Sequence, residues 1–170
     1  MKDITIYVFL IALIASINLS AQVDSVKAKE SVHSSADKLV SSFMAGDYKT
    51  FTDLTHPTIL SLSGGQEAVI NMLAGGLEDI TFLDIKVSPP EEIFVEDNIV
   101  QCVMNQREEL VIAGDSVYTN GSLIGISYDS GESWSFIGVA KIPFMQLQTV
   151  LPELNDDLDV IIQSDPMPLK

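Results

Sequence analysis

The segment LDIKV, residues 83–87, alternates aliphatic and charged side chains without a break. Leu83, Ile85 and Val87 fall on one side of an extended chain, and the charged residues between them fall on the other. A period of two predicts a β-strand with one buried and one solvated face, as in antiparallel sheets. Two prolines follow directly and end the run.

Further strand-like runs continue to residue 139. Residues 110–113 are expected to continue the preceding strand through a bend at 106–109. Residues 114–121 read as a loop, because they include the turn-forming pair Asn120-Gly121. The strands are expected over residues 83–87, 93–95, 99–104, 110–113, 122–128 and 134–139.

Helical spacing dominates the chain before this sheet. Apolar residues at intervals of three and four predict a helix over residues 24–45, with a buried stripe formed by Val32, Ala36, Leu39, Val40, Phe43 and Met44. Asp47 fits the N-cap of a short second helix over 48–54. Pro57 is placed to begin another helical turn.

Ser63 and Gln66 have the spacing of a capping box, which predicts a further helix that begins there. Gly75-Gly76 is expected to end that helix. These helices therefore precede the main run of strands, one helix-like turn is expected after it around residues 144–151, and no helix lies between the strands. This order predicts an α+β fold with an antiparallel sheet.

The chain of 170 residues carries 9 basic and 24 acidic residues, a formal net charge of −15. Such a surface repels polyanions, which excludes nucleic acid and anionic membrane surfaces as partners. The length fits one domain, expected over residues 22–152 and followed by an acidic tail over 153–170.

Cys102 is the only cysteine, so no disulfide can form within the chain. No metal or cofactor is expected, because the histidines are few and the tail lacks the glycine and spacing of a calcium loop.

A leader opens the chain, with Lys2 ahead of a mostly apolar run over residues 4–14 that decays through small and polar residues. This pattern predicts a secretory signal peptide over residues 1–21, cleaved near Ala21. An uncleaved membrane anchor is the alternative, because the run and its flank are nearly long enough to span a bilayer. Cleavage leaves an exported protein, periplasmic or extracellular, with no stable membrane insertion.

Four stretches together carry a family resemblance: residues 43–51 (FMAGDYKTF), Thr55-His56-Pro57, Gly64-Gly65-Gln66, and a hairpin from 123–129 to 134–136. In this order they resemble secreted bacterial proteins of the nuclear transport factor two-like superfamily, whose cystatin-like fold is a cone. The resemblance implies N-terminal helices packed in a strongly curved antiparallel sheet, with a pocket at the open end. Members include isomerases, dehydratases and epoxide hydrolases as well as binding and dimerisation modules, so the resemblance selects no chemistry.

The inner faces of such a cone are expected to be Val, Ile, Phe and Met with few converging polar groups. This composition favours an exported, non-catalytic domain that binds a small apolar or amphipathic ligand. The expected pocket residues are Phe43, Tyr48, Phe51, His56, Met104, Ile126 and Tyr128. A protein-interaction or homodimerisation module is the first alternative, because Gln101, Val103 and Asn105 form a mixed outer face suited to a second subunit.

An acid–base enzyme of the isomerase or dehydratase type is the second alternative. Asp53 and His56 lie three residues apart, close enough on a helical turn to hydrogen-bond, and Tyr48 is a further candidate. Burial in an apolar pocket would raise the pKa of such an acid and make it a usable general base. The structural alternative leaves Asp53 as a solvated helix residue and gives His56 the role of holding the turn before Pro57.

Residues 127–134 (SYDSGESW) fit the Asp-box pattern, which recurs from blade to blade in propeller sialidases. The pattern occurs once in this chain, so we interpret it as a structural turn. Asp129 is expected to accept backbone N–H groups, Gly131 to allow a positive φ, and Trp134 to pack over the loop.

Overall fold

The computed structural model describes residues 23–77, 79–96 and 98–169, so the expected signal peptide lies outside the described residues. The helices come first: α2 (Ser25–Met44), α3 (Tyr48–Leu54), α4 (Pro57–Leu62) and α5 (Gln66–Ala74). The strands follow: β1 (Ile80–Val87), β2 (Phe94–Glu96), β3 (Ile99–Ile112), β4 (Asp115–Ser127) and β5 (Ser135–Gly138). Helix α6 (Phe144–Val150) and the short β6 (Met167–Pro168) complete the chain. This order confirms the α+β class.

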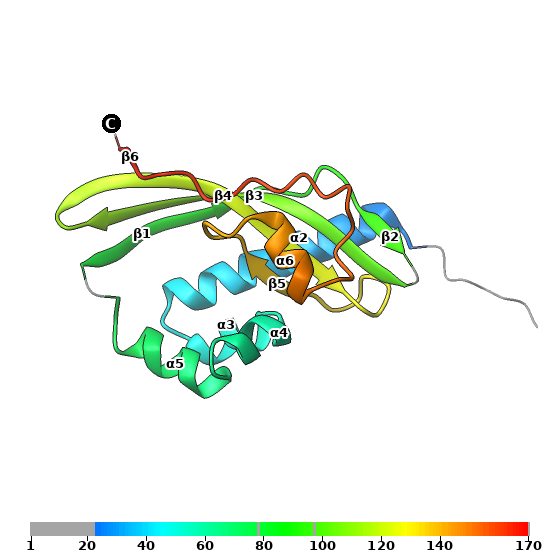
Figure 1. Cartoon of the computed structure of the whole chain (residues 1–170), viewed down its shortest axis with the longest axis horizontal. Helices are drawn as coiled ribbons and strands as arrows, with labels where there is room; N and C mark the ends of the chain where they lie inside the picture. The colour runs from blue at the N-terminus through cyan, green and yellow to red at the C-terminus, as the bar shows by residue number, and fades with distance from the viewer. Residues whose placement is uncertain (1–22, 78, 97, 170) are drawn as a thin grey trace, which may run out of the picture.

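One antiparallel sheet holds all the strands, in the order β1-β3-β4-β5, with β2 paired to β3 and β6 paired to β4. It curls strongly into a half-barrel, and α2 runs along its concave side (Figure 1). The two longest strands, β3 and β4, pair without interruption from Val100 opposite Ser127 to Ile112 opposite Asp115. A bulge between Phe82 and Asp84 in β1 adds to the bend of the edge.

The start of β4 differs from the sequence prediction. Residues 115–121 were expected in a loop, but they belong to β4, and Asn120 and Gly121 lie in the ladder opposite Arg107 and Gln106. The turn lies earlier, at Ala113 and Gly114, where φ is 51° and 94°. Two positive φ angles in a two-residue connection match the twist of a tight hairpin, so the strands pair from their first residues.

The long helix α2 forms as predicted and packs most of its apolar stripe on the concave face, but Met44, expected in that stripe, is 41% exposed at the end of the helix. Its N-cap is Asp24, whose carboxylate accepts hydrogen bonds from two backbone N–H groups of the first turn. The buried stripe contacts a core cluster of Val100, Cys102, Met104, Leu123, Trp134 and Phe136. Close approach of helix to sheet is possible because β4 has Gly125 at the crossing, where a Cβ would lie 2.9 Å from Val32 Cγ2.

The convex face of the sheet is covered by the C-terminal part of the chain. Ile124, Ile126, Ile137 and Val139 form a second core cluster with Leu147, Leu151, Leu154 and Leu158. The segment expected as an acidic tail thus supplies Leu154 and Leu158 to a buried cluster. Leu147 of α6 packs on β4 and β5, and Figure 1 shows the later C-terminal segment running beside β3 and β4. Among the described residues, no helix is long and apolar enough to cross a membrane.

The outer face expected to bind a second subunit is partly occupied by this segment. Gln101 is 2% exposed, and its side chain donates to the carbonyl of Glu153 at 2.6 Å and accepts from the N–H of Asn155 at 3.0 Å. The prediction that Gln101 lies on a free surface is therefore wrong. Its amide instead holds the C-terminal segment against the sheet.

Capping differs between the short helices. Asp47 caps α3 as predicted, with its carboxylate accepting from the N–H of Thr50 at 3.1 Å. The predicted capping box of α5 does not form, because Ser63 donates to the carbonyl of Ile59 and the N-cap is Gly65 at φ 96°. The side chain of Gln66 is therefore available to a neighbouring helix.

Candidate functional site

A cavity of about 330 Å³ lies between the helices and the concave face of the sheet. Its helical wall is mostly aliphatic and aromatic and comes from all four N-terminal helices, including Leu39, Phe43, Phe51, Ile59, Val69 and Met72. The sheet contributes Phe82 and Ile85 from β1, Leu123 from β4, and Phe136 and Gly138 from β5. The wall is therefore predominantly apolar.

An aromatic cluster forms one side of this cavity. The ring centroid of Phe43 lies 5.3 Å from that of Phe51 and 5.0 Å from that of Phe82, the second pair in a T-shaped arrangement. Ring pairs at these distances stabilise each other beyond simple burial of area. The cluster connects α2, α3 and β1 and gives this side of the cavity a fixed shape.

Polar groups enter the cavity wall at β3. Gln106 and Glu108 follow Met104 on the same side of the strand, because side chains alternate across the ladder. Gln106 Nε2 donates to Glu108 Oε1 at 2.6 Å. Thr119 Oγ1 donates to Glu108 Oε2 at 3.2 Å, and Gln163 Nε2 donates to the same oxygen at 2.9 Å. One carboxylate is thus held by three uncharged donors.

A smaller cavity of about 160 Å³ adjoins the first at these residues. The two share Gln106, Glu108 and Gly138 in their linings. The smaller cavity is the more polar, since Thr119, Ser122 and Gln163 also line it. The larger cavity is therefore apolar, the smaller adjoining cavity is polar, and Glu108 lies at the boundary between them.

The sequence-predicted pocket residues fall into separate places. Phe43 and Phe51 line the 330 Å³ cavity, and Tyr48 lies with Phe43 in a smaller neighbouring cavity of about 230 Å³. Met104 is fully buried in the core against α2. Ile126 is fully buried on the opposite face of the sheet, under the C-terminal segment. Neither Met104 nor Ile126 lines any of these cavities, because neighbouring elements cover both faces of this half of the sheet.

His56 and Tyr128 meet each other away from the apolar cavity. His56 caps α4, with Nδ1 accepting from the N–H of Thr58 at 3.3 Å. A neutral ring then carries its proton on Nε2, which lies 2.9 Å from the hydroxyl of Tyr128. Tyr128 in turn donates to Glu153 Oε1 at 2.9 Å. This chain of hydrogen bonds joins α4, the end of β4 and the C-terminal segment.

The pKa shifts of His56 and Tyr128 oppose acid–base catalysis by this pair near neutral pH. Burial lowers the pKa of His56, with the nearby Glu153 carboxylate partly opposing the shift. Burial, together with the hydrogen bond to Glu153, raises the pKa of Tyr128 to about 12. Near neutral pH the His56 ring is thus neutral and the Tyr128 phenol is protonated. These hydrogen bonds therefore have a structural role, because they connect α4, β4 and the C-terminal segment.

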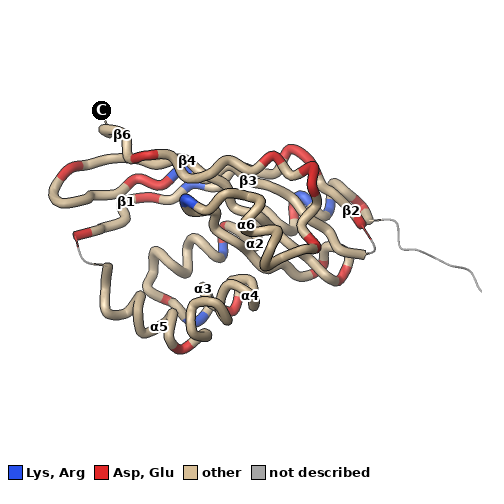
Figure 2. The backbone as a smooth tube through the Cα atoms, viewed as in Figure 1, with Lys and Arg blue, Asp and Glu red and all other residues tan. Residues whose placement is uncertain are grey.

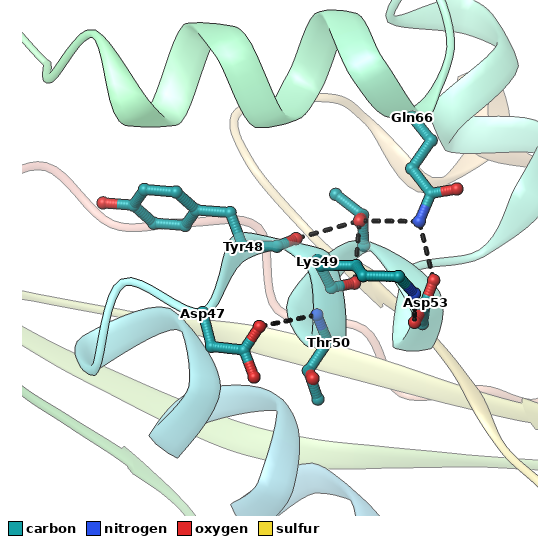
Figure 3. Close-up of polar contacts among 7 residues, drawn as sticks. Asp47, Tyr48, Lys49, Thr50, Asp53 and Gln66 are labelled. Atoms are coloured by element: carbon teal, nitrogen blue, oxygen red, sulfur yellow. Dashed lines mark hydrogen bonds and ion pairs between the residues drawn. The ribbon is translucent and has the colours of Figure 1, made fainter.

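Asp53 and His56 do not hydrogen-bond each other. Asp53 accepts from Lys49 Nζ at 2.6 Å and from Gln66 Nε2 at 2.6 Å, as Figure 3 shows. The hydrogen bond from Lys49 is the largest cause that holds the pKa of Asp53 below its usual value, which is opposite to the shift a general base needs. The ring of Tyr48 points away from this network (Figure 3). The expected catalytic group is therefore not assembled.

The Asp-box segment forms a closed turn. Asp129 accepts from the backbone N–H groups of Glu132 and Ser133 at 3.1 and 2.8 Å, and Gly131 has φ 92°. These hydrogen bonds, with that from the Ser133 hydroxyl foremost, lower the pKa of Asp129 to about 2. Trp134 is 5% exposed, and its Nε1 donates to the carbonyl of Gly131 and to Ser31 of α2. The contacts of Asp129 and Trp134 described here are all with other residues of this turn or of α2, in agreement with a structural role for the turn.

No group of three or more His, Cys, Asp or Glu able to hold a metal occurs in the part of the chain that the structure describes. Cys102 is fully buried, and desolvation raises the pKa of its thiol to about 12. Charged residues are spread over helices, strands, loops and the C-terminal segment, with acidic ones in clear excess (Figure 2). The apolar cavity with its single carboxylate is therefore the candidate site.

Sequence reasoning missed Glu108, Gln106, Gly138 and Gln163. The signal for the first two was present, because Val100, Cys102, Met104, Gln106 and Glu108 share one parity along a strand. A bend at residues 106–109, as predicted from the sequence, would interrupt this alternation, so Gln106 and Glu108 were not assigned to the same face as Met104.

No protein-family model, curated protein or solved structure matches this chain.

Proposed function

We propose that the protein binds a small, mostly apolar or amphipathic molecule in the 330 Å³ cavity and is not a catalyst. The observation that carries this proposal is the volume and lining of the cavity itself. Protein interiors are packed to the density of organic crystals, with few voids larger than a water molecule. Ligand sites are concave and mostly apolar with a few placed polar groups, which is how this cavity is built.

The volume sets the size of the ligand. An apolar cavity of about 150 Å³ holds benzene, so the 330 Å³ here suits a molecule of roughly ten to fifteen non-hydrogen atoms. A ligand of that size with good apolar contact binds with a Kd of about 1–100 μM. The proposal therefore concerns a small metabolite or lipid fragment and not a folded partner.

The proposal agrees with the family resemblance and with export. Helices ahead of a curled antiparallel sheet, with a cavity between the helices and the concave face, support the interpretation as a nuclear transport factor two-like cone. The N-terminal signal-peptide pattern supports a site of action in the periplasm or outside the cell. The hydrogen-bonded positions of Asp53 and His56 count against the isomerase or dehydratase alternative.

Gly138 provides the sharpest test of binding. It lines both cavities, and a Cβ added there would meet no atom within 4 Å. Gly138→Leu therefore places a side chain into the cavity without backbone strain. Decanol is the probe, because it is flexible, uncharged and of the expected size. We expect isothermal titration calorimetry to give a micromolar Kd for the wild type and at least about tenfold weaker binding for Gly138→Leu.

Ala74→Leu is the matched control. Ala74 is exposed at the end of α5 and lines none of the cavities described above, so the same side chain added there should change the Kd by less than about twofold. Circular dichroism must show both variants folded. Absence of decanol binding by the wild type, or equal binding by wild type and Gly138→Leu, would contradict the proposal.

A further inference from the structure

We propose that the ligand carries a cationic, amine-type head group, and that Glu108 receives that group at the boundary of the two cavities. This inference rests on the proposed function, and it adds the chemical class of the ligand. It depends on where Glu108 lies, on what already holds its carboxylate, and on which charges are absent from the cavity wall.

The position of Glu108 is fixed by the sheet. It pairs with Ile85 of β1 on one side and with Thr119 of β4 on the other, so its backbone is in the middle of the ladder. Such a residue has little freedom to turn its side chain to the other face, because side-chain direction follows strand parity. The carboxylate therefore stays at the cavity wall.

The charge of Glu108 has no cationic partner among the described residues. Its three hydrogen bonds come from Gln106, Thr119 and Gln163, all of which are uncharged. The nearest basic residue in sequence, Arg107, lies on the opposite face, where it pairs with Glu109 at 3.1 Å and stacks over the ring of Tyr118. The fold thus supplies this carboxylate with hydrogen bonds but with no counter-charge, so the cationic group of a ligand would be its ionic partner.

The carboxylate also retains capacity to accept a hydrogen bond. A carboxylate offers about four acceptor positions, and three are occupied here. Glu108 lines both cavities, so an incoming N–H donor can reach it from the apolar side while the ligand body stays in the larger cavity. Charge-assisted hydrogen bonds of this kind are about twice as strong as neutral ones.

The remaining wall excludes the opposite head group. No Lys, Arg or His lines either cavity among the residues that the structure describes. A carboxylate or phosphate ligand would therefore face Glu108 without a compensating charge. The overall charge of −15 adds a long-range field that favours cations and disfavours anions.

The test compares three ligands with one apolar body: decylamine, decanol and decanoate. For wild-type protein near neutral pH we expect calorimetry to give a Kd for decylamine at least about tenfold below that for decanol, with decanoate the weakest. Glu108→Gln should bring the Kd of decylamine to within about threefold of decanol. It should leave the Kd of decanol nearly unchanged, because the apolar body still fits.

Glu109→Gln is the matched control, since it removes the same charge from the neighbouring residue on the other face of β3. It should change the Kd of decylamine by less than about twofold. Equal affinity of the wild type for decylamine and decanol would overturn the head-group inference and leave the binding function intact. Failure of decanol to bind the wild type would overturn the binding function itself. The wild-type series gives this decision even if Glu108→Gln does not fold.

Discussion

Met104 and Glu108 lie on the same face of β3, four residues apart, and have different surroundings. Met104 is fully buried against α2, whereas Glu108 is half-buried at the cavity. The strand period determines which face a residue occupies, but the element packed on that face determines whether the residue serves the core or a site. Whether a residue on this face of β3 belongs to the core or to the candidate site therefore depends on whether α2 packs against it.

His56 makes a prediction about pH at the scale of one residue. Burial lowers its pKa below the usual value of 6.5. Between that lowered pKa and about 6.5 the unfolded chain binds more protons than the folded one, so stability is complete above about pH 6.5 and falls as the pH drops through this window. We expect the urea midpoint of the wild type to decrease from about pH 7.5 to about pH 5.

The variant His56→Gln separates this residue from other titrating groups. Glutamine keeps a donor near the Tyr128 hydroxyl but does not titrate. The decrease of the urea midpoint over the same pH range should therefore be smaller in the variant than in the wild type. Identical pH profiles for the two proteins would show that His56 does not carry this dependence.

At the scale of elements, the contact of α2 with β4 depends on Gly125. A Cβ at this position would lie 2.9 Å from Val32 Cγ2 and 3.2 Å from Cys102 Sγ. Gly125→Ala should therefore overpack the core and lower the free energy of unfolding by about 1–3 kcal/mol, measured by chemical denaturation.

Gly138→Ala is the control in the next strand, because a Cβ there meets nothing within 4 Å. Its free energy of unfolding should stay within about 0.5 kcal/mol of the wild type. The account of helix–sheet packing fails if the two alanine variants are equally stable.

Elements with local signals could be predicted from the sequence, and those set by distant contacts could not. α2 and α3 have side-chain caps and apolar spacing within their own residues, and they form as expected. The start of β4 depends on a hairpin at Ala113-Gly114, where alanine at positive φ gives no sequence signal. Met104 and Ile126 were assigned to the pocket because the sequence does not reveal that α2 covers one face of the sheet and the C-terminal segment the other.

At the scale of the whole molecule, the sheet is filled on both faces at one end and faces a cavity at the other. α2 and the C-terminal segment cover β4 and β5 from opposite sides, which explains the run of fully buried residues at the end of β4. At the other end, α3, α4 and α5 lie across from β1 (Figure 1), and the 330 Å³ cavity is between them. One end of the molecule therefore supplies stability, and the other supplies the candidate site.

The most direct test of the central claim is methyl NMR of isoleucine-labelled protein titrated with decanol. Ile59 and Ile85 line the cavity, and Ile59 also packs at the edge of the second core cluster, whereas Ile124 and Ile137 are fully buried inside that cluster. A ligand in the cavity should shift the methyl signals of Ile59 and Ile85 in a saturable way and leave those of Ile124 and Ile137 nearly unmoved. Shifts confined to Ile124 and Ile137, or no saturable shift at any of the four, would contradict binding in this cavity.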